Sequence, residues 1–141
     1  MGIVVVIDIN APAERVWGAL VDVEHWPDWT PTMTSVARID TGAFGSGSSA
    51  RIRQPRLGTL TWTVTEFTPG QSFVWEARRR GLTLVAGHSL RTGSAGTVHL
   101  TLALDQKGPV GRLLEPLTGR TVRRAVALEA DGHKRCAETP A

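Results

Sequence analysis

Two polar side chains, His88 and Gln54, fall among apolar residues in segments that alternate as β-strands do. Counting every second residue places both on the face that carries the apolar side chains, so we expect both to point inward. With an unperturbed pKa of about 6.5, His88 is the inward group suited to proton transfer near neutral pH, which makes it the candidate catalytic residue. Both residues are also candidates for orienting a bound molecule. The alternative is that the backbone or water satisfies His88, as it does for most histidines in an apolar setting.

Other kinds of site are not indicated. The four histidines are isolated from one another and from Cys136, without Cys-x-x-Cys or His-Glu-x-x-His spacing, so we expect no metal site and no cofactor. The glycines of residues 42–47 precede no helix and therefore lack the helix terminus that binds a phosphate. The run Gly45-Ser46-Gly47 also lacks the Gly-x-Ser-x-Gly spacing of a nucleophile elbow.

The predicted inward face is otherwise apolar and rich in tryptophan. Burial of each large side chain would contribute about 1.5–3 kcal/mol, so close packing alone would also explain this pattern. A strongly curved sheet around one helix is hard to fill, however, and ligand pockets are typically apolar with few polar groups. We therefore expect a cavity lined, together with Gln54 and His88, by Trp26, Trp29, Met33, Trp62, Trp75, Leu113 and Leu117. His25 is a second polar candidate at the mouth of that cavity.

The elements that must position these residues follow in order along the chain. Residues 3–9 are rich in β-branched side chains and predict a strand. Asn10-Ala11-Pro12 then predicts the start of a helix with Asn10 as its cap. The expected buried face of that helix consists of Val16, Trp17, Leu20 and Val23. Residues 25–31 contain two prolines, which predicts a short structured turn instead of a longer regular helix.

A sheet and a long helix are expected in the rest of the chain. Turn signals recur about every ten residues from Ser35 to Leu104, which predicts a meandering antiparallel sheet. Its expected strands are residues 50–54, 59–67, 73–79, 82–91 and 97–104. After Gly108-Pro109, apolar residues recur at helical spacing for about five turns. Because Pro116 has no backbone N–H, we expect a short helical segment, a kink near residues 114–116, and then the long helix.

Several short runs, in this order, resemble the START-like (SRPBCC) superfamily, also called the helix-grip fold, and in particular its polyketide cyclase/dehydrase-like branch. The matching runs are residues 9–17 (INAPAERVW), Asp22 followed by Trp26, Trp29 and Pro31, residues 62–66 (WTVTE) leading to Pro69-Gly70, then Phe73-Val74-Trp75, Gly87-His88, Gly96-Thr97 and the last helix to Glu138. The resemblance implies an α+β fold: a curved antiparallel β-sheet wrapped around a long C-terminal helix, with two short helices after the first strand. It also implies a cavity between sheet and helix.

What the resemblance implies for activity is broader, because the superfamily includes lipid carriers, hormone receptors and polyketide aromatase/cyclases. The cyclases are thought to use a cavity arginine with hydroxyl or acidic partners. Here Arg51 and Arg53 alternate with Ile52 and should point to solvent, and the chain has no tyrosine. Glu66 and Glu76 are poorly placed unless a β-bulge reverses their direction. The inward residues therefore do not assemble a catalytic set of that kind.

Length and composition limit the number of domains and the classes of partner and location that we expect. A chain of 141 residues predicts one domain, residues 1–141. The net charge is +3, but the densest basic run, residues 78–80, falls where two strands should join, so we expect no nucleic-acid binding. The apolar run near the start is far shorter than the roughly 20 residues of a membrane span. A lone cysteine fits a reducing compartment, and the cytoplasm is the expected location.

Three hypotheses about function follow. The leading one is a binding protein, not an enzyme or only weakly catalytic, for a small hydrophobic molecule such as a polyketide, lipid or aromatic metabolite, acting as a monomer or homodimer. The alternative is a polyketide cyclase/dehydrase-like enzyme in which His88 is the general acid or base. A third is a stress-related or toxin–antitoxin-type partner protein that associates through the outer face of the sheet.

Overall fold

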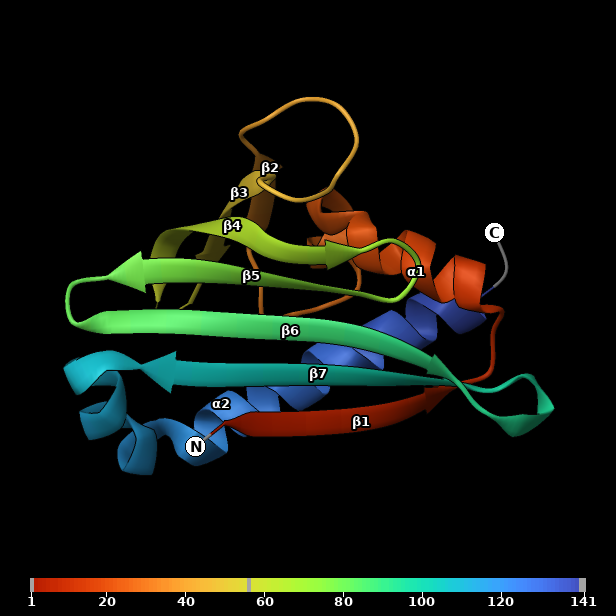
Figure 1. The fold of residues 1–141 in the computed structure, drawn as a ribbon. Helices are drawn as coiled ribbons and strands as arrows, with labels where there is room; N and C mark the ends of the chain where they lie inside the picture. The colour runs from red at the N-terminus through yellow and green to blue at the C-terminus, as the bar shows by residue number, and fades with distance from the viewer. Residues whose placement is uncertain (1, 56, 140–141) are drawn as a thin grey trace.

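A computed structural model describes residues 2–55 and 57–139, and in this part of the chain seven strands form one antiparallel sheet. The strand order is β1-β7-β6-β5-β4-β3-β2, so β1 returns to pair with the last strand (Figure 1). The elements are β1 (Ile3–Ile9), α1 (Ala13–Val21), the 3₁₀ helix η1 (Val23–Asp28), β2 (Ser35–Arg38), β3 (Ser49–Gln54), β4 (Gly58–Thr68), β5 (Ser72–Arg79), β6 (Leu82–Thr92), the 3₁₀ turn η2 (Ser94–Gly96), β7 (Val98–Lys107) and α2 (Gly108–Glu138).

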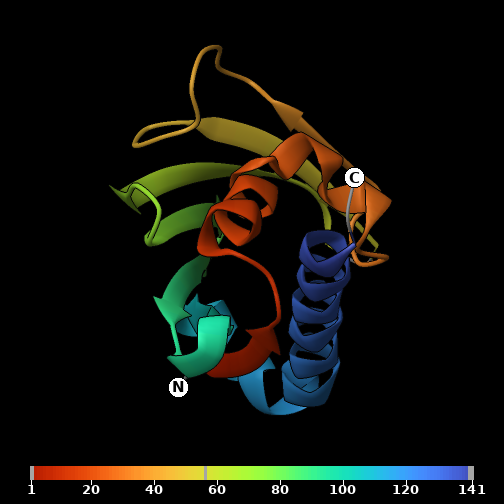
Figure 2. The ribbon, with the colours of Figure 1, turned by 90° about the vertical axis from the view of Figure 1, so that its right-hand side faces the viewer.

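The sheet bends around α2, which lies along its concave side (Figure 2). The two short helices, α1 and η1, follow β1 directly, and α1 packs against α2. This arrangement is the helix-grip fold, and the predicted α+β class is confirmed. A helix held against a curved sheet has an apolar face on each side of the interface, and the residues between them form the interior.

Alternation along the strands determines which side chains face α2. On β4, Leu60, Trp62 and Val64 are buried and the residues between them are exposed. On β6, Leu84 and His88 are likewise buried. Since successive side chains of a strand point to opposite faces, the whole inward register follows from these anchors. The inward positions predicted from the sequence are confirmed on these strands.

The hairpin between β5 and β6 connects the sheet to the start of α2. Gly81 has φ of +73°, a backbone conformation that costs little only for glycine. A Cβ atom at this position would lie 2.6 Å from Cγ2 of Val110, so the close approach also excludes a side chain. The backbone N–H of Val110 donates to the carbonyl of Gly81 at 2.9 Å. The first turn of α2 is therefore fixed to this hairpin.

Two local features differ from the sequence-based expectation. The short strand β2 was not predicted; it pairs with β3 at the edge of the sheet. The prediction that Asn10 caps α1 is wrong, because Pro12 is the N-cap residue and no side chain caps the helix. The backbone N–H of Asn10 instead donates to Oε2 of Glu138 at 2.7 Å, which joins the end of β1 to the end of α2.

The expected short segment, kink and long helix fall within one continuous helix, Gly108–Glu138. Pro116 lies within α2, and Figure 1 shows the first turns of the helix running at an angle to the later ones. Burial is uneven along it: Val126 and Ala130 are buried, but the side chains of Leu113 and Leu117 are 71% and 78% exposed. The later turns of α2 therefore form the packed interface with the rest of the fold.

Candidate functional site

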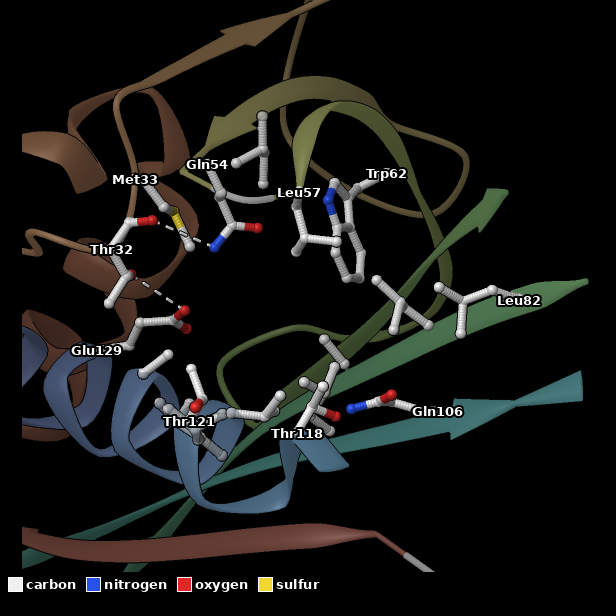
Figure 3. A pocket seen from close by; sticks show the side chains of 18 of the residues that line it. Thr32, Met33, Gln54, Leu57, Trp62, Leu82, Gln106, Thr118, Thr121 and Glu129 are labelled. Carbon is white, nitrogen blue, oxygen red and sulfur yellow. Dashed lines mark hydrogen bonds between the residues drawn. The ribbon is translucent and has the colours of Figure 1, made fainter. Parts of the chain in front are cut away.

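A cavity of about 640 Å³ lies between the concave face of the sheet and α2 (Figure 3). This volume falls within the range of about 300–1,000 Å³ typical of small-molecule pockets. The wall is contributed by η1, by the chain between η1 and β2, by β3 to β7, and by α2. Most of its surface is apolar, and its large side chains include Trp26, Met33, Ile52, Leu57, Trp62, Trp75, Leu82, Leu84, Leu102 and Leu114.

Seven of the nine predicted ligand-binding residues lie in this wall, namely Trp26, Met33, Gln54, Trp62, Trp75, His88 and Leu117. Leu117 stands at the opening, since most of its side chain is exposed. The placement predicted for Trp29 is wrong: its indole Nε1–H donates to Nδ1 of His133 at 3.4 Å, away from the cavity wall. Leu113 is also outside the wall, because the turn of α2 that carries it directs this side chain to solvent.

Aromatic rings form one connected part of the wall. The ring centroids of Trp26 and Trp75 lie 5.4 Å apart in an edge-to-face arrangement, and those of Trp62 and Trp75 lie 5.8 Å apart. Phe73, which does not itself line the cavity, stacks on His88 with the ring centroids 4.2 Å apart. Pairs of this kind contribute about 0.5–1.5 kcal/mol beyond their burial, so this side of the cavity is firmly built before any ligand is present.

His88 is a neutral member of this aromatic group. A carbonyl oxygen can only accept, so the contact of Nδ1 with the carbonyl of Phe73 at 3.3 Å means that Nδ1–H donates. Burial lowers the pKa of His88 to about 3, with His133 nearby acting in the same direction. A base with so low a pKa is poorly matched to proton transfer near neutrality. The backbone-satisfied alternative for His88 is therefore the one observed.

His25 does not belong to the site. Its side chain is 62% exposed and Nδ1 pairs with Oδ1 of Asp22 at 2.7 Å, an interaction that raises the pKa of His25. The expected outward directions are found for Arg51, Arg53 and Glu66, which are exposed. The bulge between Val64 and Glu66 on β4 therefore leaves Glu66 outside the cavity. In the described residues no cluster of three metal-ligating side chains occurs.

The polar side of the wall includes a carboxyl group that the sequence analysis did not single out. Glu129 of α2 lines the cavity, and Oε1 of its carboxyl accepts a hydrogen bond from the hydroxyl of Thr32 at 3.3 Å (Figure 3). Burial raises the pKa of Glu129 to about 7, although the Thr32 hydrogen bond acts in the opposite direction. Its remaining exposed surface faces the cavity. Near neutral pH this carboxyl therefore exists in both protonation states.

A signal for Glu129 was present in the sequence. Val122, Val126, Glu129 and His133 are spaced by four, three and four residues, which places them on one face of a helix. The structure confirms that Val126 and His133 are buried and that Val122 packs against the core. The residues predicted from helical spacing after Pro109 are Val110, Leu113, Leu114, Leu117, Thr121, Ala125 and Leu128. Five of them line the cavity, namely Val110, Leu114, Leu117, Thr121 and Ala125, but this largely apolar pattern did not include Glu129.

Two arginines stand at the rim. Arg79 and Arg80, in the hairpin between β5 and β6, are exposed residues that also border the cavity. The Arg79 guanidinium donates a hydrogen bond to the carbonyl of Leu57, which holds this part of the rim together. Arg78 and Arg79 end β5 and the turn itself is Arg80-Gly81, so the expected strand junction is found at the cavity opening, one to two residues later than predicted. Within residues 2–55 and 57–139, no helix has the length and hydropathy needed to cross a bilayer.

Comparisons with known proteins agree with this geometry. A family model described as "Polyketide cyclase / dehydrase and lipid transport" matches residues 2–138. No curated protein matches the sequence significantly. Among solved structures, a hypothetical protein from Helicobacter pylori is similar, with a TM-score of 0.84 and 12% identity over 97% of this chain and 88% of that chain.

Two further structures carry functional or superfamily names. A START superfamily protein from Mycobacterium smegmatis has a TM-score of 0.70 and 18% identity, covering 95% of this chain and 97% of its own. The Zhui aromatase/cyclase from Streptomyces sp. R1128 has a TM-score of 0.69 and 18% identity, covering 96% and 94%. At such identities the likeness establishes the shared fold.

Proposed function

Because the chain belongs to the polyketide cyclase / dehydrase and lipid transport family, we propose that it binds a small hydrophobic molecule in the cavity between the sheet and α2. The observation that carries the proposal is a largely apolar cavity of about 640 Å³ between the sheet and α2. Polyketides, lipids and aromatic metabolites all offer an apolar body of suitable size.

The wall supports binding through buried area. Trp62 and Trp75 on the sheet and Leu114 on α2 border the same space, so a flat or elongated apolar molecule would contact both layers. Transfer of apolar surface from water contributes about 25 cal/mol per Å². The aromatic pairs described above hold their own positions, so little side-chain ordering remains to oppose binding.

Calorimetric titration with 1-naphthalenemethanol tests the proposal. If each of its twelve non-hydrogen atoms contributes about 0.6 kcal/mol, the dissociation constant should be roughly 10 µM. The variant Ala125→Trp fills the cavity from α2, and we expect it to weaken binding at least about tenfold. Ala127→Trp adds the same side chain on the exposed side of α2 and serves as the matched control. Equal affinities for the two variants would contradict the proposal.

The alternative of a cyclase/dehydrase-like enzyme has less support in the form that uses His88. The low pKa of His88 and its hydrogen bond to Phe73 leave it a weak base. Turnover of an aromatic polyketide substrate that is abolished by His88→Ala, with affinity retained, would restore this alternative. Association with a partner protein through the outer sheet face stays a prediction, and size-exclusion chromatography with pull-down experiments tests it.

Two further expectations belong with this proposal. We propose that residues 1–141 form one ligand-binding domain that works as a monomer or homodimer, and a cytoplasmic location fits its lone Cys136. Sedimentation of the purified chain, with and without the naphthalene probe, distinguishes a monomer from a dimer. Fractionation of cells that express it tests the location.

A further inference from the structure

One end of the cavity carries polar groups from three separate elements. Thr32 lies in the chain between η1 and β2, Gln54 ends β3, and Glu129 lies on α2 (Figure 3). Their side chains are linked through Thr32: its hydroxyl donates to Glu129, and its carbonyl accepts a hydrogen bond from Nε2 of Gln54 at 3.4 Å. Polar groups are costly to place in an apolar wall, so their convergence at one end is a specific feature of this cavity.

The orientation of the Gln54 amide is fixed by its partner. The carbonyl of Thr32 can only accept, so the NH₂ group of Gln54 must face it and the side-chain oxygen must face the other way. Figure 3 shows this oxygen directed into the cavity. Among the described residues it has no hydrogen-bond partner in the structure. Gln54 thus presents a free acceptor to a ligand.

Glu129 presents a second acceptor. Thr30 is buried and its hydroxyl lies 2.9 Å from that of Thr32. Since the Thr32 hydroxyl donates to Glu129, Thr30 donates to Thr32, and the chain of hydrogen bonds ends at the carboxyl. This leaves Oε2 of Glu129 free toward the cavity. Burial alone raises the pKa, to about 7, and no charged side chain contributes to that shift, so the group is largely ionised at pH 8.

The other titratable groups around this end stay uncharged or point elsewhere. Burial lowers the pKa of His133, one turn further along α2, to about 4, and that of His88 on β6 to about 3. Both histidines are therefore neutral between pH 6 and pH 8. Arg53, next to Gln54 on β3, is exposed on the outer face of the sheet. Arg79 and Arg80 border the cavity from the exposed hairpin between β5 and β6, and the Arg79 guanidinium donates to the carbonyl of Leu57. The charge within the polar end itself is that of Glu129.

We propose that Gln54 and Glu129 bind the head group of an apolar ligand that donates hydrogen bonds, a hydroxyl or a protonated amine. The inference rests on the proposed function, and it adds a chemical class to it. Oε1 of Gln54 and Oε2 of Glu129 are both acceptors, so a ligand that offers only an ether oxygen would place lone pairs against lone pairs and leave these two atoms unsatisfied. The apolar body of the ligand lies against Trp62, Trp75 and α2.

Three probes that share a naphthalene ring and differ in the head group show how much the head group contributes to affinity. Calorimetry at pH 8 compares 1-naphthalenemethanol, 1-naphthylmethylamine and 1-(methoxymethyl)naphthalene. A hydrogen bond to a charged group increases affinity about 10- to 100-fold. We therefore expect the alcohol or the amine to bind at least tenfold more tightly than the ether. Tighter binding of the amine would identify a cationic head group. Binding of the alcohol at least as tight as that of the amine would identify a hydroxyl. The donor preference should shrink at pH 6, where Glu129 is protonated.

Matched variants connect this preference to the two residues. Gln54→Met and Glu129→Met keep the length of the side chain and remove its acceptors, so each should reduce the donor preference to about threefold or less. Gln106→Met makes the same change on another side of the cavity, as Figure 3 shows, and should retain the full preference. Thermal unfolding followed by circular dichroism checks that each variant is folded.

The possible failures are distinguishable. Equal affinity of the ether and the two donors, with heats that Ala125→Trp removes, would overturn the head-group inference and leave the cavity as a binding site. A donor preference that survives in both Gln54→Met and Glu129→Met would overturn it as well. If none of the three probes binds, both this inference and the proposed function fail.

Discussion

The two halves of α2 have the same secondary structure but different surroundings. In the second half a Cβ atom at Gly132 would lie 2.2 Å from the backbone oxygen of Trp29, so the helix there is in direct contact with η1 and its following residues. In the first half a Cβ at Gly119 would have no atom within 4 Å. Leu113 and Leu117 are exposed in this half, whereas Ala130 and Ala137 are fully buried in the other.

The two halves of α2 therefore contribute differently: the second half is packed against the rest of the fold, and the first half passes over the cavity. The second half fixes α2 against β1 and the short helices, and the hydrogen bond between Asn10 and Glu138 closes that end. The first half is attached by its first turn at Gly81 and then borders the cavity through Leu114 and Thr118. A helix attached at both ends can pass over an unfilled interior without losing its position.

Gly132→Ala should cause the largest loss of stability, because it lies in the packed half of α2. The new methyl group would collide with a backbone oxygen, which cannot move as a flexible side chain can, so we expect a loss of about 3 kcal/mol in the free energy of unfolding. Gly119→Ala is the control and should add about 0.5–1 kcal/mol, since alanine is the better helix former and has room there. Urea unfolding measures both. Similar effects of the two substitutions would show that the halves are packed alike.

Acid should weaken the packed interior next. The pKa values of His88 and His133 are lowered from 6.5 to about 3 and 4, so near pH 5.5 the unfolded chain binds almost two protons that the folded chain does not. The raised pKa of Glu129, about 7, acts in the opposite direction by one proton. The net difference of one proton lowers stability by about 1.4 kcal/mol per pH unit as the pH falls.

Stability curves measured between pH 7 and pH 4.5 test this balance. The substitution Glu129→Met removes the carboxyl and its opposing contribution. The change in the free energy of unfolding per pH unit should therefore roughly double. The stability of the variant relative to the parent chain should be greatest at pH 8 and smallest below pH 5. An unchanged slope in the variant would contradict the buried ionisation assigned to Glu129.

Val126→Ala removes apolar contact in the second half of α2, at a buried residue that also lines the cavity. Val126 is 6% exposed, and the loss of two buried carbon groups at about 0.8 kcal/mol each predicts a decrease of about 1.5 kcal/mol. Thermal or urea unfolding gives the value. A change below about 0.5 kcal/mol would mean that this part of α2 is as loosely packed as the part over the cavity opening.

Leu113→Ala should have the smallest effect. The side chain is 71% exposed and lies outside the cavity wall, so we expect a change within about 0.5 kcal/mol in stability and no change in the affinity for the naphthalene probe. The same substitution at Leu117, which borders the opening, should weaken binding of the probe without altering the stability of the fold. A large loss of stability at Leu113 would show that this turn packs on the sheet.

Strand residues were predicted well because alternation leaves little freedom. Once Leu60, Trp62 and Val64 are placed inside, a shift of one residue would expose all three, so the inward face of the sheet followed from the sequence. Gln54 and His88 were assigned to the cavity by the same count, and the structure places both in its wall.

Helical and loop residues were harder to assign. On α2 the apolar spacing identified Leu114, Leu117 and Ala125, which line the cavity, but a search for apolar residues passes over a polar member of the same wall such as Glu129. Thr32 lies in irregular chain, which has no period to count. The edge strand β2 is four residues long, too short for an alternation signal.

A crystal structure with 1-bromonaphthalene tests the central claim most directly, because the anomalous signal of bromine locates the molecule without ambiguity. The account predicts a bromine position between α2 and the indole rings of Trp62 and Trp75, with the backbone of α2 unchanged. A solid interior in the crystal, or bromine found solely on the outer surface, would contradict it.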